Sequence, residues 1–270
     1  MTDAPPDSVP GLKPGPGSGS GRDIESCRHY QDEKFEGSDS SANRTILPAE
    51  LEECRFAHCT FKGLRFDHCA INECHFDHCQ FFECEFSSCH ARGVNFEHCH
   101  FFEKDTEQPT KFRFAVLTDC HFLHCDLSLC DLSRSSLYRS SFRQCQLTGS
   151  DFTQASGSQT IGHSTVMNEF SMTDCNLAYA NFSGAVFAQA DLSASRLSHA
   201  ILDDADFTDA ILCDCELHNI EADRVVIRGA DLRGATLGGL DVRNIDLTDV
   251  TVQPHQAIAL LETLGISIQD

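Results

Sequence analysis

Residues 74–101 read CHFDHCQFFECEFSSCHARGVNFEHCHF. An apolar residue occupies every fifth position of this stretch, at Phe76, Phe81, Phe86, Ala91, Phe96 and Phe101. Neither an α-helix, with about 3.6 residues per turn, nor a β-strand, with a period of two, keeps such a repeat on one side. A square solenoid does, because each pentapeptide forms one flat side and four sides complete a coil of about twenty residues. The pattern therefore predicts an all-β fold, a right-handed quadrilateral β-helix whose every fifth side chain points to the axis.

The residue two positions before each central apolar residue is almost always small, and we call this position the small slot. Fourteen of the 16 cysteines occupy it, and alanine takes it over from Ala180 onward. A position that accepts Cys, Ala and Ser alike indicates selection for small volume in a close-packed interior. We therefore interpret these cysteines as reduced thiols that pack as small apolar groups and have no chemical role.

The repeat runs in three arrays, from Leu51 to Phe101, from about Phe112 to Phe152 and from Met172 to Val252. The two interruptions are polar or contain glycine, so we expect them to project as loops. The predicted organisation is a disordered Pro/Gly/Ser tail at 1–21, an N-terminal cap or irregular first coil at 22–50, the β-helix at 51–252 with loops at about 103–111 and 153–170, and a C-terminal helix and strand at 253–270.

The final segment changes period. Pro254 suits the first turn of a helix and Gly265 is placed to end it, which predicts a short amphipathic helix followed by a strand-like tail. An open solenoid end needs either a polar cap or a partner, and the pattern alone leaves both readings open. The apolar residues that would form a contact between two copies are Ala257, Ile258, Leu261, Leu264 and Ile266.

The repeat units identify a resemblance. The runs Ala190-Asp191-Leu192-Ser193 and Ala230-Asp231-Leu232-Arg233-Gly234 resemble the A(D/N)LXX signature of pentapeptide-repeat proteins. The run from Cys175 to Ser183 and the ending from Gln256 to Ile266 resemble the quinolone-resistance (Qnr) branch of that family. The resemblance covers roughly residues 30 to 270, with extra cysteine-rich coils and an N-terminal extension. It implies a β-helix that dimerises through its C-terminus.

The net charge indicates the kind of partner. The formal net charge is -21 and the pI is about 4.9, which disfavours direct binding to nucleic acid or to an anionic membrane and favours a basic partner. No segment resembles a signal peptide or a membrane span, so we expect a cytoplasmic protein. Acidic residues gather on two sides of the C-terminal coils, either as a solvated surface or as a rod that imitates a DNA duplex. The acidic residues that we single out are Asp203, Asp204, Asp206 and Asp209.

Several histidine–cysteine pairs suggest a zinc site, but their register argues against one. In the pair His78-Cys79 the cysteine points inward and the histidine two residues past the central Phe76 points outward. We expect the histidines to stack as a surface ladder, with a metal-binding or pH-sensitive ladder as the alternative. No nucleophile elbow or phosphate-binding loop is present, and a filled solenoid leaves no cleft for a substrate. We predict no enzyme activity, no catalytic residue, no metal and no cofactor.

The Qnr resemblance implies a function. Qnr-like proteins bind the type II topoisomerases DNA gyrase and topoisomerase IV and protect them from drugs that trap cleaved DNA, and two projecting loops contribute. The resemblance predicts topoisomerase contacts from the two loops and from the acidic residues above, and the loop residues are Glu103, Lys104, Asp105, Glu107, Gln108, Gln159, His163 and Met167. The alternatives are a pentapeptide-repeat scaffold with another partner and a metal-dependent sensor or enzyme.

Overall fold

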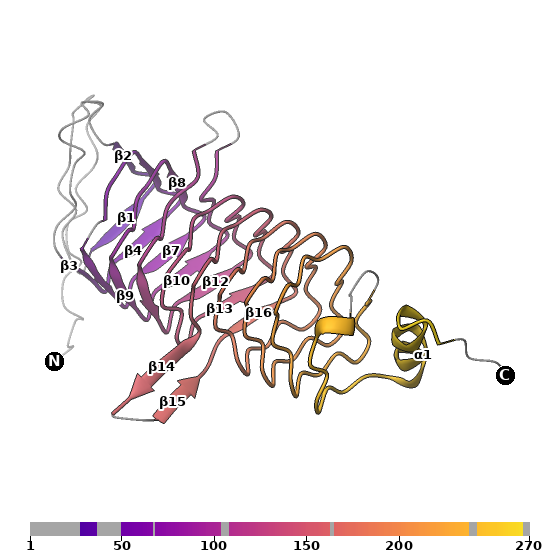
Figure 1. Cartoon of the computed structure of the whole chain (residues 1–270). Helices are drawn as coiled ribbons and strands as arrows, with labels where there is room; N and C mark the ends of the chain where they lie inside the picture. The colour runs from indigo at the N-terminus through magenta and orange to yellow at the C-terminus, as the bar shows by residue number, and fades with distance from the viewer. Residues whose placement is uncertain are drawn as a thin grey trace, which may run out of the picture.

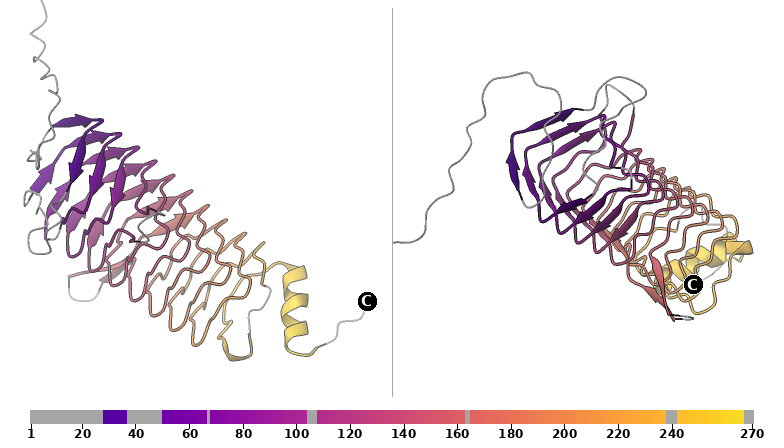
Figure 2. Two further views of the ribbon diagram at one scale, coloured as in Figure 1. Left: turned by 90° about the horizontal axis from the view of Figure 1, so that it is seen from above. Right: turned by 90° about the vertical axis from the view of Figure 1, so that its left-hand side faces the viewer.

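The structure is a computed structural model that describes residues 28–36, 50–66, 68–103, 108–162, 165–237 and 242–266. The predicted tail at 1–21, much of the predicted cap at 22–50 and the end of the predicted C-terminal strand lie outside these residues. The described chain forms a rod of stacked coils, with the first strands at one end and helix α1 (Pro254–Thr263) at the other (Figure 1). Figure 2 shows the same rod from two further directions. The quadrilateral β-helix predicted from the five-residue period is confirmed.

The four sides of the rod are numbered here in chain order. Side 1 carries a seven-stranded parallel sheet of β1 (His29–Gln31), β4 (Arg55–Ala57), β7 (His75–Asp77), β10 (Asn95–Glu97), β12 (His121–Leu123), β13 (Ser141–Arg143) and β16 (Ser171–Thr173). Side 2 carries β2 (Lys34–Glu36), β5 (Thr60–Lys62) and β8 (Gln80–Phe82). Side 4 carries β3 (Glu50–Glu52), β6 (Ala70–Asn72), β9 (His90–Arg92) and β11 (Val116–Thr118). Side 3 and the C-terminal coils pair through single-residue parallel bridges, and a 3-10 turn, η1, spans Val242–Asn244.

The core consists of the central residues stacked coil on coil. Phe56 and Phe76 stack with ring centroids 4.8 Å apart, and Phe56 meets Phe61 of the next side edge-on at 5.4 Å. Stacked contacts along the axis and T-shaped contacts across it are the two arrangements that aromatic rings prefer. The five-residue period predicts the fold correctly because the central side chain of every pentapeptide points to the axis and packs on the one in the next coil.

The small slot supplies hydrogen bonds as well as space. On side 1 the carbonyl oxygen of a central residue receives its donor from a slot residue of the following coil. The Cys99 thiol donates to the Phe76 carbonyl at 3.4 Å, and the Ser195 hydroxyl donates to the Met172 carbonyl at 2.7 Å. Burial raises the pKa of the Cys120 thiol to about 12, so this slot thiol remains a neutral donor at pH 7. The expectation that the slot selects volume alone is wrong.

Alanine suffices where the chain makes a tighter turn. In the C-terminal coils a single bridge residue replaces the three-residue strand, and the backbone N–H three residues after the centre reaches its carbonyl. The Ala180 N–H donates in this way to the Leu177 carbonyl at 3.1 Å. Since buried carbonyl groups need a partner, the turn type decides whether the slot must carry a donor.

Two buried slot serines test this rule. The Ser140 hydroxyl donates to the Leu117 carbonyl at 2.9 Å and accepts from the Cys120 N–H at 3.1 Å. The Ser150 hydroxyl donates to the Leu147 carbonyl, which also receives the Ser150 N–H at 3.1 Å. Ser140→Ala is expected to lower the free energy of unfolding by about 1–3 kcal/mol, because it leaves two buried groups without partners. Ser150→Ala, the matched control, should cost less than about 1 kcal/mol, and equal losses in denaturant unfolding would contradict the rule.

The first projection is shorter than the predicted loop. Phe96 pairs with Phe122, twenty-six residues on rather than twenty, so six residues are inserted between sides 2 and 3. Thr110, predicted to lie in the loop, is fully buried in a small slot, and its hydroxyl donates to the Phe81 carbonyl at 2.8 Å. Lys111 is also part of the coil, since it bridges to Glu85 and Asp131 of the neighbouring coils.

The second projection is an antiparallel hairpin of β14 (Ser158–Ile161) and β15 (Thr165–Asn168) between sides 4 and 1. Phe142 pairs with Met172, thirty residues on, so ten residues are inserted. Residues 153–157, predicted to be loop, stay in the coil. Gly157 takes a central position, and a Cβ there would meet Phe170 Cβ at 2.6 Å. The apolar residue is missing at this position because Phe170, two residues before the central Met172, fills the space.

Candidate functional site

The hairpin β14–β15 is held at its base by Arg139. The Arg139 Nε lies 2.9 Å from Asp119 Oδ1 and 3.3 Å from Glu169 Oε2, and the Arg139 N–H donates to the Glu169 carbonyl at 2.6 Å. The arginine therefore ties the returning end of the hairpin to the corner between sides 4 and 1. Its guanidinium lies between a carboxylate of the rod, Asp119, and one at the base of the hairpin, Glu169.

The hairpin exposes apolar side chains on β15 and borders a groove. Val166 and Met167 are 56 % and 36 % exposed, and Met167 lies directly opposite Gln159 in the register. A groove of about 530 Å³ separates Gln159 from side 4, with Arg92 and the buried Tyr138 in its wall. The structure thus brings together two of the three predicted hairpin contacts, while His163 lies outside the described residues.

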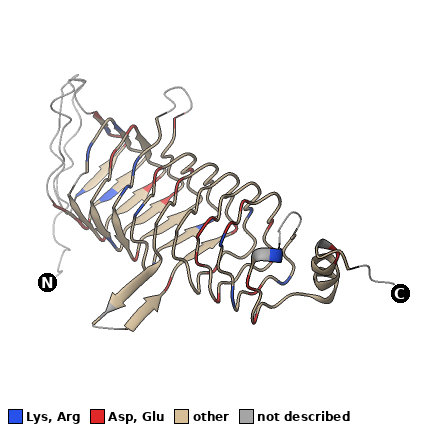
Figure 3. Ribbon diagram, in the orientation of Figure 1, with Lys and Arg blue, Asp and Glu red and all other residues tan. Residues whose placement is uncertain are grey.

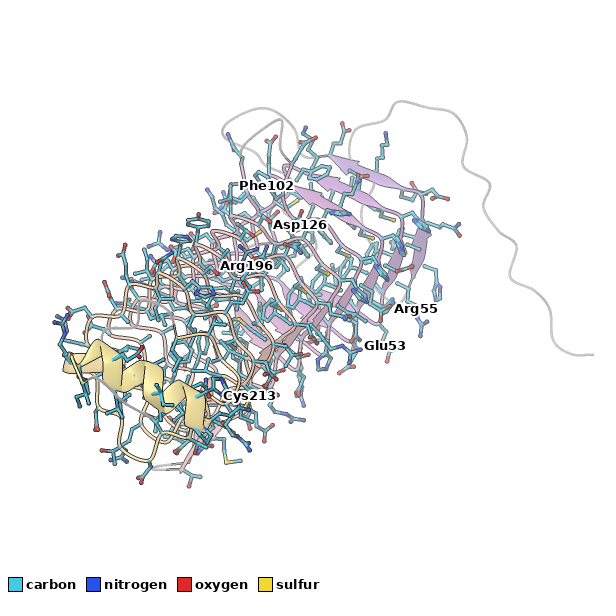
Figure 4. The ribbon with its side chains drawn as sticks, turned by 90° about the vertical axis from the view of Figure 1, so that its right-hand side faces the viewer. Glu53, Arg55, Phe102, Asp126, Arg196 and Cys213 are labelled. Atoms are coloured by element: carbon cyan, nitrogen blue, oxygen red, sulfur yellow. The ribbon has the colours of Figure 1, made fainter. Side chains whose placement is uncertain are left out.

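A lysine on β5 contacts the start of the first loop. Lys62 Nζ lies 3.4 Å from Glu103 Oε2 and 3.8 Å from Glu83 Oε1. Phe102 follows the last buried residue of side 2 and marks the point where the chain leaves the rod (Figure 4). Gln108 is exposed, whereas Lys104, Asp105 and Glu107 lie outside the described residues.

The two projections leave the rod from diagonally opposite edges. The loop interrupts the passage from side 2 to side 3, and the hairpin interrupts the passage from side 4 to side 1. Figure 1 shows the hairpin β14–β15 on the side of the rod away from β2 and β8. The predicted loop residues therefore do not form one patch. A single partner would have to enclose the rod, or two parts of a partner would contact it separately.

The predicted acidic residues lie on sides 3 and 4 of the C-terminal coils. Figure 3 shows Asp and Glu, in red, along these coils. Asp203 Oδ1 accepts the Asp223 N–H at 2.8 Å, and Asp206 Oδ1 accepts the N–H and the hydroxyl of Thr208 at 2.9 and 2.6 Å. The same arrangement recurs at Asp131, Asp151 and Asp191, so the Asp-x-Ser/Thr run is a turn motif. These carboxylates organise the coil and display negative charge at the spacing of the repeat.

Arg224 neutralises part of this acidic surface. Its Nε and Nη2 contact Asp204 at 2.6 and 2.7 Å, and its Nη1 lies 2.5 Å from Asp223 Oδ2. The hydrogen bond from Arg224 lowers the pKa of Asp204. Asp209 stands at a corner with φ 55° and is exposed. Asp204 and Asp223 therefore contribute less to the negative potential of this surface than their charges alone would.

Helix α1 closes the C-terminal end of the rod through Gln256, a buried polar side chain. The Gln256 Nε2 donates to the Leu232 and Ala235 carbonyls at 2.7 Å each, and its Oε1 accepts the Gln253 N–H at 2.7 Å. The opposite face of the helix exposes Ile258, Leu261 and Leu264, while Ala257 is half-buried and Ile266, just beyond the helix, is exposed. The segment therefore caps the solenoid and also presents an apolar face.

Double substitution of this face tests whether it joins two copies. An isolated pair of exposed leucines on a ten-residue helix is unfavourable in water, so we expect the helix to bury them against a second copy. Leu261→Asp with Leu264→Asp should convert a dimer to a monomer in sedimentation, with the thermal unfolding of the rod little changed. Gln256→Ala is the contrasting variant, since it should destabilise the last coil. A wild-type monomer would contradict this prediction.

The described residues were compared with the requirements of a metal site and of a membrane span. Within its ranges, no group of three or more His, Cys, Asp or Glu side chains is placed to hold one metal ion. No helix in the described part is long and apolar enough to cross a bilayer.

Comparisons with known proteins agree with this geometry. The family profile "Pentapeptide repeats" matches residues 115–154, 171–209 and 190–229, with eight copies of the repeat. A trypsin-treated variant of QnrB1, a plasmid-mediated fluoroquinolone resistance protein, is 30 % identical over 78 % of this chain and 99 % of its own, with a TM-score of 0.69. The chain belongs to the pentapeptide-repeat family. Full-length QnrB1 is 28 % identical over 90 % of this chain and 99 % of its own, with a TM-score of 0.66.

A more distant structure shares the fold alone. HetL, a pentapeptide-repeat protein involved in heterocyst differentiation regulation from the cyanobacterium Nostoc sp. strain PCC 7120, is 17 % identical with a TM-score of 0.53. It covers 78 % of this chain and 88 % of its own. A search of curated protein sequences gives no significant match. Within the family, the chain is similar to QnrB1 at 26–30 % identity.

Sequence reasoning missed Arg139 and Gln256. Arg139 sits at an ordinary corner, and its role depends on a hairpin whose course the repeat does not encode. Gln256 is a polar residue in an amphipathic helix, so it is expected to be exposed. It is buried here because the last coil offers carbonyl groups that accept its hydrogen bonds. Its spacing from Gln253, three residues before it, was the only available signal, because such a pair can form a capping box.

Proposed function

We propose that this protein is a non-enzymatic binding protein that protects a type II topoisomerase, DNA gyrase or topoisomerase IV, from quinolone-type poisons. The observation that carries the proposal is the similarity to QnrB1, a fluoroquinolone resistance protein, over 99 % of that chain. The filled interior supports binding rather than catalysis, since the central positions are occupied by large buried side chains. The Qnr resemblance in the sequence supplies the class of partner.

The acidic C-terminal coils suit a partner that normally binds DNA. Asp203 and Asp223 lie one coil apart on side 3, Asp206 lies on side 4, and the net charge of the chain is -21. A basic DNA-binding surface would be attracted to such a rod, and the attraction would weaken with salt over a Debye length of about 8 Å at physiological ionic strength. We therefore infer that the acidic rod attracts the topoisomerase and that the two projections protect the cleaved complex from the drug.

The role of the acidic residues has a direct test. Changing Asp203, Asp204, Asp206 and Asp209 to Asn removes four charges while retaining the acceptor oxygens and the tolerance of positive φ at Asp204 and Asp209. Gyrase affinity should fall about tenfold or more at low salt, and its salt dependence should become shallower. The matched control changes Asp126, Asp131, Asp151 and Asp191 to Asn. An equal loss of affinity in both variants would contradict a localised acidic site.

A second candidate function is a pentapeptide-repeat scaffold with another basic protein partner. The extra N-terminal coils favour it, because they add exposed histidines and a grooved side 4. A supercoiling assay of gyrase with ciprofloxacin, titrated with this protein, distinguishes the two. Recovery of supercoiling supports the topoisomerase function, and no recovery at any protein concentration supports the scaffold.

A further inference from the structure

Four histidines stack along the corner between sides 1 and 2, and we call them the histidine ladder: His58, His78, His98 and His124. Each follows a central phenylalanine of side 1 by two residues and has φ between 51° and 54°, which turns its side chain outward. The ring centroids of successive members are 5.1, 4.6 and 4.9 Å apart, with interplanar angles of 38°, 27° and 11°. The stacking predicted from the twenty-residue spacing is confirmed for His58, His78 and His98, and His124, twenty-six residues after His98, extends the row.

The backbone holds the ladder in register. The His58, His78 and His98 N–H groups each donate to a carbonyl of the next coil at 2.9 Å, and the His124 N–H does so at 3.1 Å. The cysteine that follows each histidine is buried, so the thiols point inward and take no part. The protein therefore presents a row of imidazoles on a rigid edge, with the side chains exposed enough to rotate.

A carboxylate orients one member. His78 Nδ1 lies 2.7 Å from Asp77 Oδ1, and the imidazole is half-exposed. A neutral imidazole whose Nδ1–H donates a hydrogen bond to a carboxylate has its lone pair on Nε2, directed away from that contact. This carboxylate–histidine arrangement is the one that commonly supports metal-bound imidazoles. The neighbouring rings of His58 and His98 lie on either side of it.

We propose that the histidine ladder binds a divalent transition-metal ion of the Ni²⁺, Cu²⁺ or Zn²⁺ class between neighbouring imidazoles. Imidazole nitrogens suit these ions, with metal–nitrogen bonds of about 2.0–2.1 Å, so two ligating nitrogens must come within about 4.2 Å of each other. The pair His78–His98 has the shortest centroid separation, 4.6 Å, and its stacked rings must tilt toward each other to direct two nitrogen lone pairs at one ion. Two imidazoles and water complete the site, since no described group of three side chains is placed to hold a metal.

The acidic chain assists this site without forming part of it. A net charge of -21 raises the local concentration of cations near the rod. The ladder itself lies on the N-terminal coils, whereas the acidic residues assigned to topoisomerase binding lie on the C-terminal coils. Metal binding at the ladder is therefore independent of the proposed function.

The test is a calorimetric titration of the full chain with NiCl₂ alone, because Ni²⁺ does not oxidise thiols. His78→Asn with His98→Asn leaves His58 and His124 without a histidine neighbour, and Asn tolerates the positive φ of both positions. The matched control is His68→Asn with His199→Asn, two exposed corner histidines with φ 56° and 61°. We expect wild type and control to bind alike and the ladder variant to bind at least tenfold more weakly.

Two results would overturn the proposal. One is a ladder variant that retains wild-type affinity, and the other is a wild type that binds no Ni²⁺ at millimolar concentration. Circular dichroism of each variant without metal should match the wild type. If the ladder variant fails to fold, the single variant His98→Asn leaves only the pair with the widest ring separation, His58–His78 at 5.1 Å, and it should bind Ni²⁺ more weakly than the wild type.

Discussion

Phe182→Asp is expected to unfold the coils around it and to lower the free energy of unfolding by more than about 5 kcal/mol. Phe182 is fully buried and stacks on Phe152 with ring centroids 5.1 Å apart. Loss of a buried phenylalanine alone costs about 3–5 kcal/mol, and an unpaired carboxylate in the interior adds a desolvation penalty. Thermal unfolding followed by circular dichroism measures the effect.

Two variants control this prediction. Phe182→Leu places at this centre the residue that occupies Leu177 on the preceding side and Leu202 in the next coil, and it should cost only about 1–2 kcal/mol. Tyr179→Asp introduces the same charge at a corner that is 60 % exposed, and it should change stability little. An unchanged melting temperature for Phe182→Asp would show that the side chain does not point to the axis.

Deletion of either projection is expected to abolish rescue of gyrase from ciprofloxacin while binding to gyrase persists. The register dictates how to make the deletions. Removing residues 104–109 deletes the six inserted residues and joins Glu103 to Thr110, which restores the five-residue step from Phe101 to Phe112 and keeps the Thr110 hydrogen bond. Removing residues 160–169 deletes the ten inserted residues of the hairpin in the same way.

Two measurements on each deletion variant separate binding from rescue. Binding, measured by retention on immobilised gyrase, should remain because the acidic coils are unchanged, whereas recovery of supercoiling should disappear. Arg139→Ala is a graded version of the hairpin deletion, since it removes the contacts to Asp119 and Glu169 at the base of the hairpin. Full rescue by both deletion variants would place protection elsewhere on the rod.

The sequence predicts on which side of the rod a residue lies, but not which residue its side chain contacts. The twenty-residue spacing correctly stacks His58 on His78 and places Asp203 and Asp206 on adjacent sides. It does not reveal that Arg224 pairs with Asp204, because corner side chains of neighbouring coils choose partners by rotamer and charge. It also does not show that the two projections leave opposite edges, which follows only when the inserted residues are counted in the paired register.

What the sequence by itself determines is the repeating part of the molecule. The central phenylalanines, the small slots and the start of α1 at Pro254 follow from local patterns, because each coil repeats the contacts of the coil before it. Only the tertiary structure decides where the repeat is broken and how its buried carbonyls are satisfied. Gly157 needs Phe170 from beyond the hairpin, Phe76 needs the thiol of Cys99 from the next coil, and the last coil needs Gln256. These are contacts between residues distant in the chain, and a five-residue pattern carries no record of them.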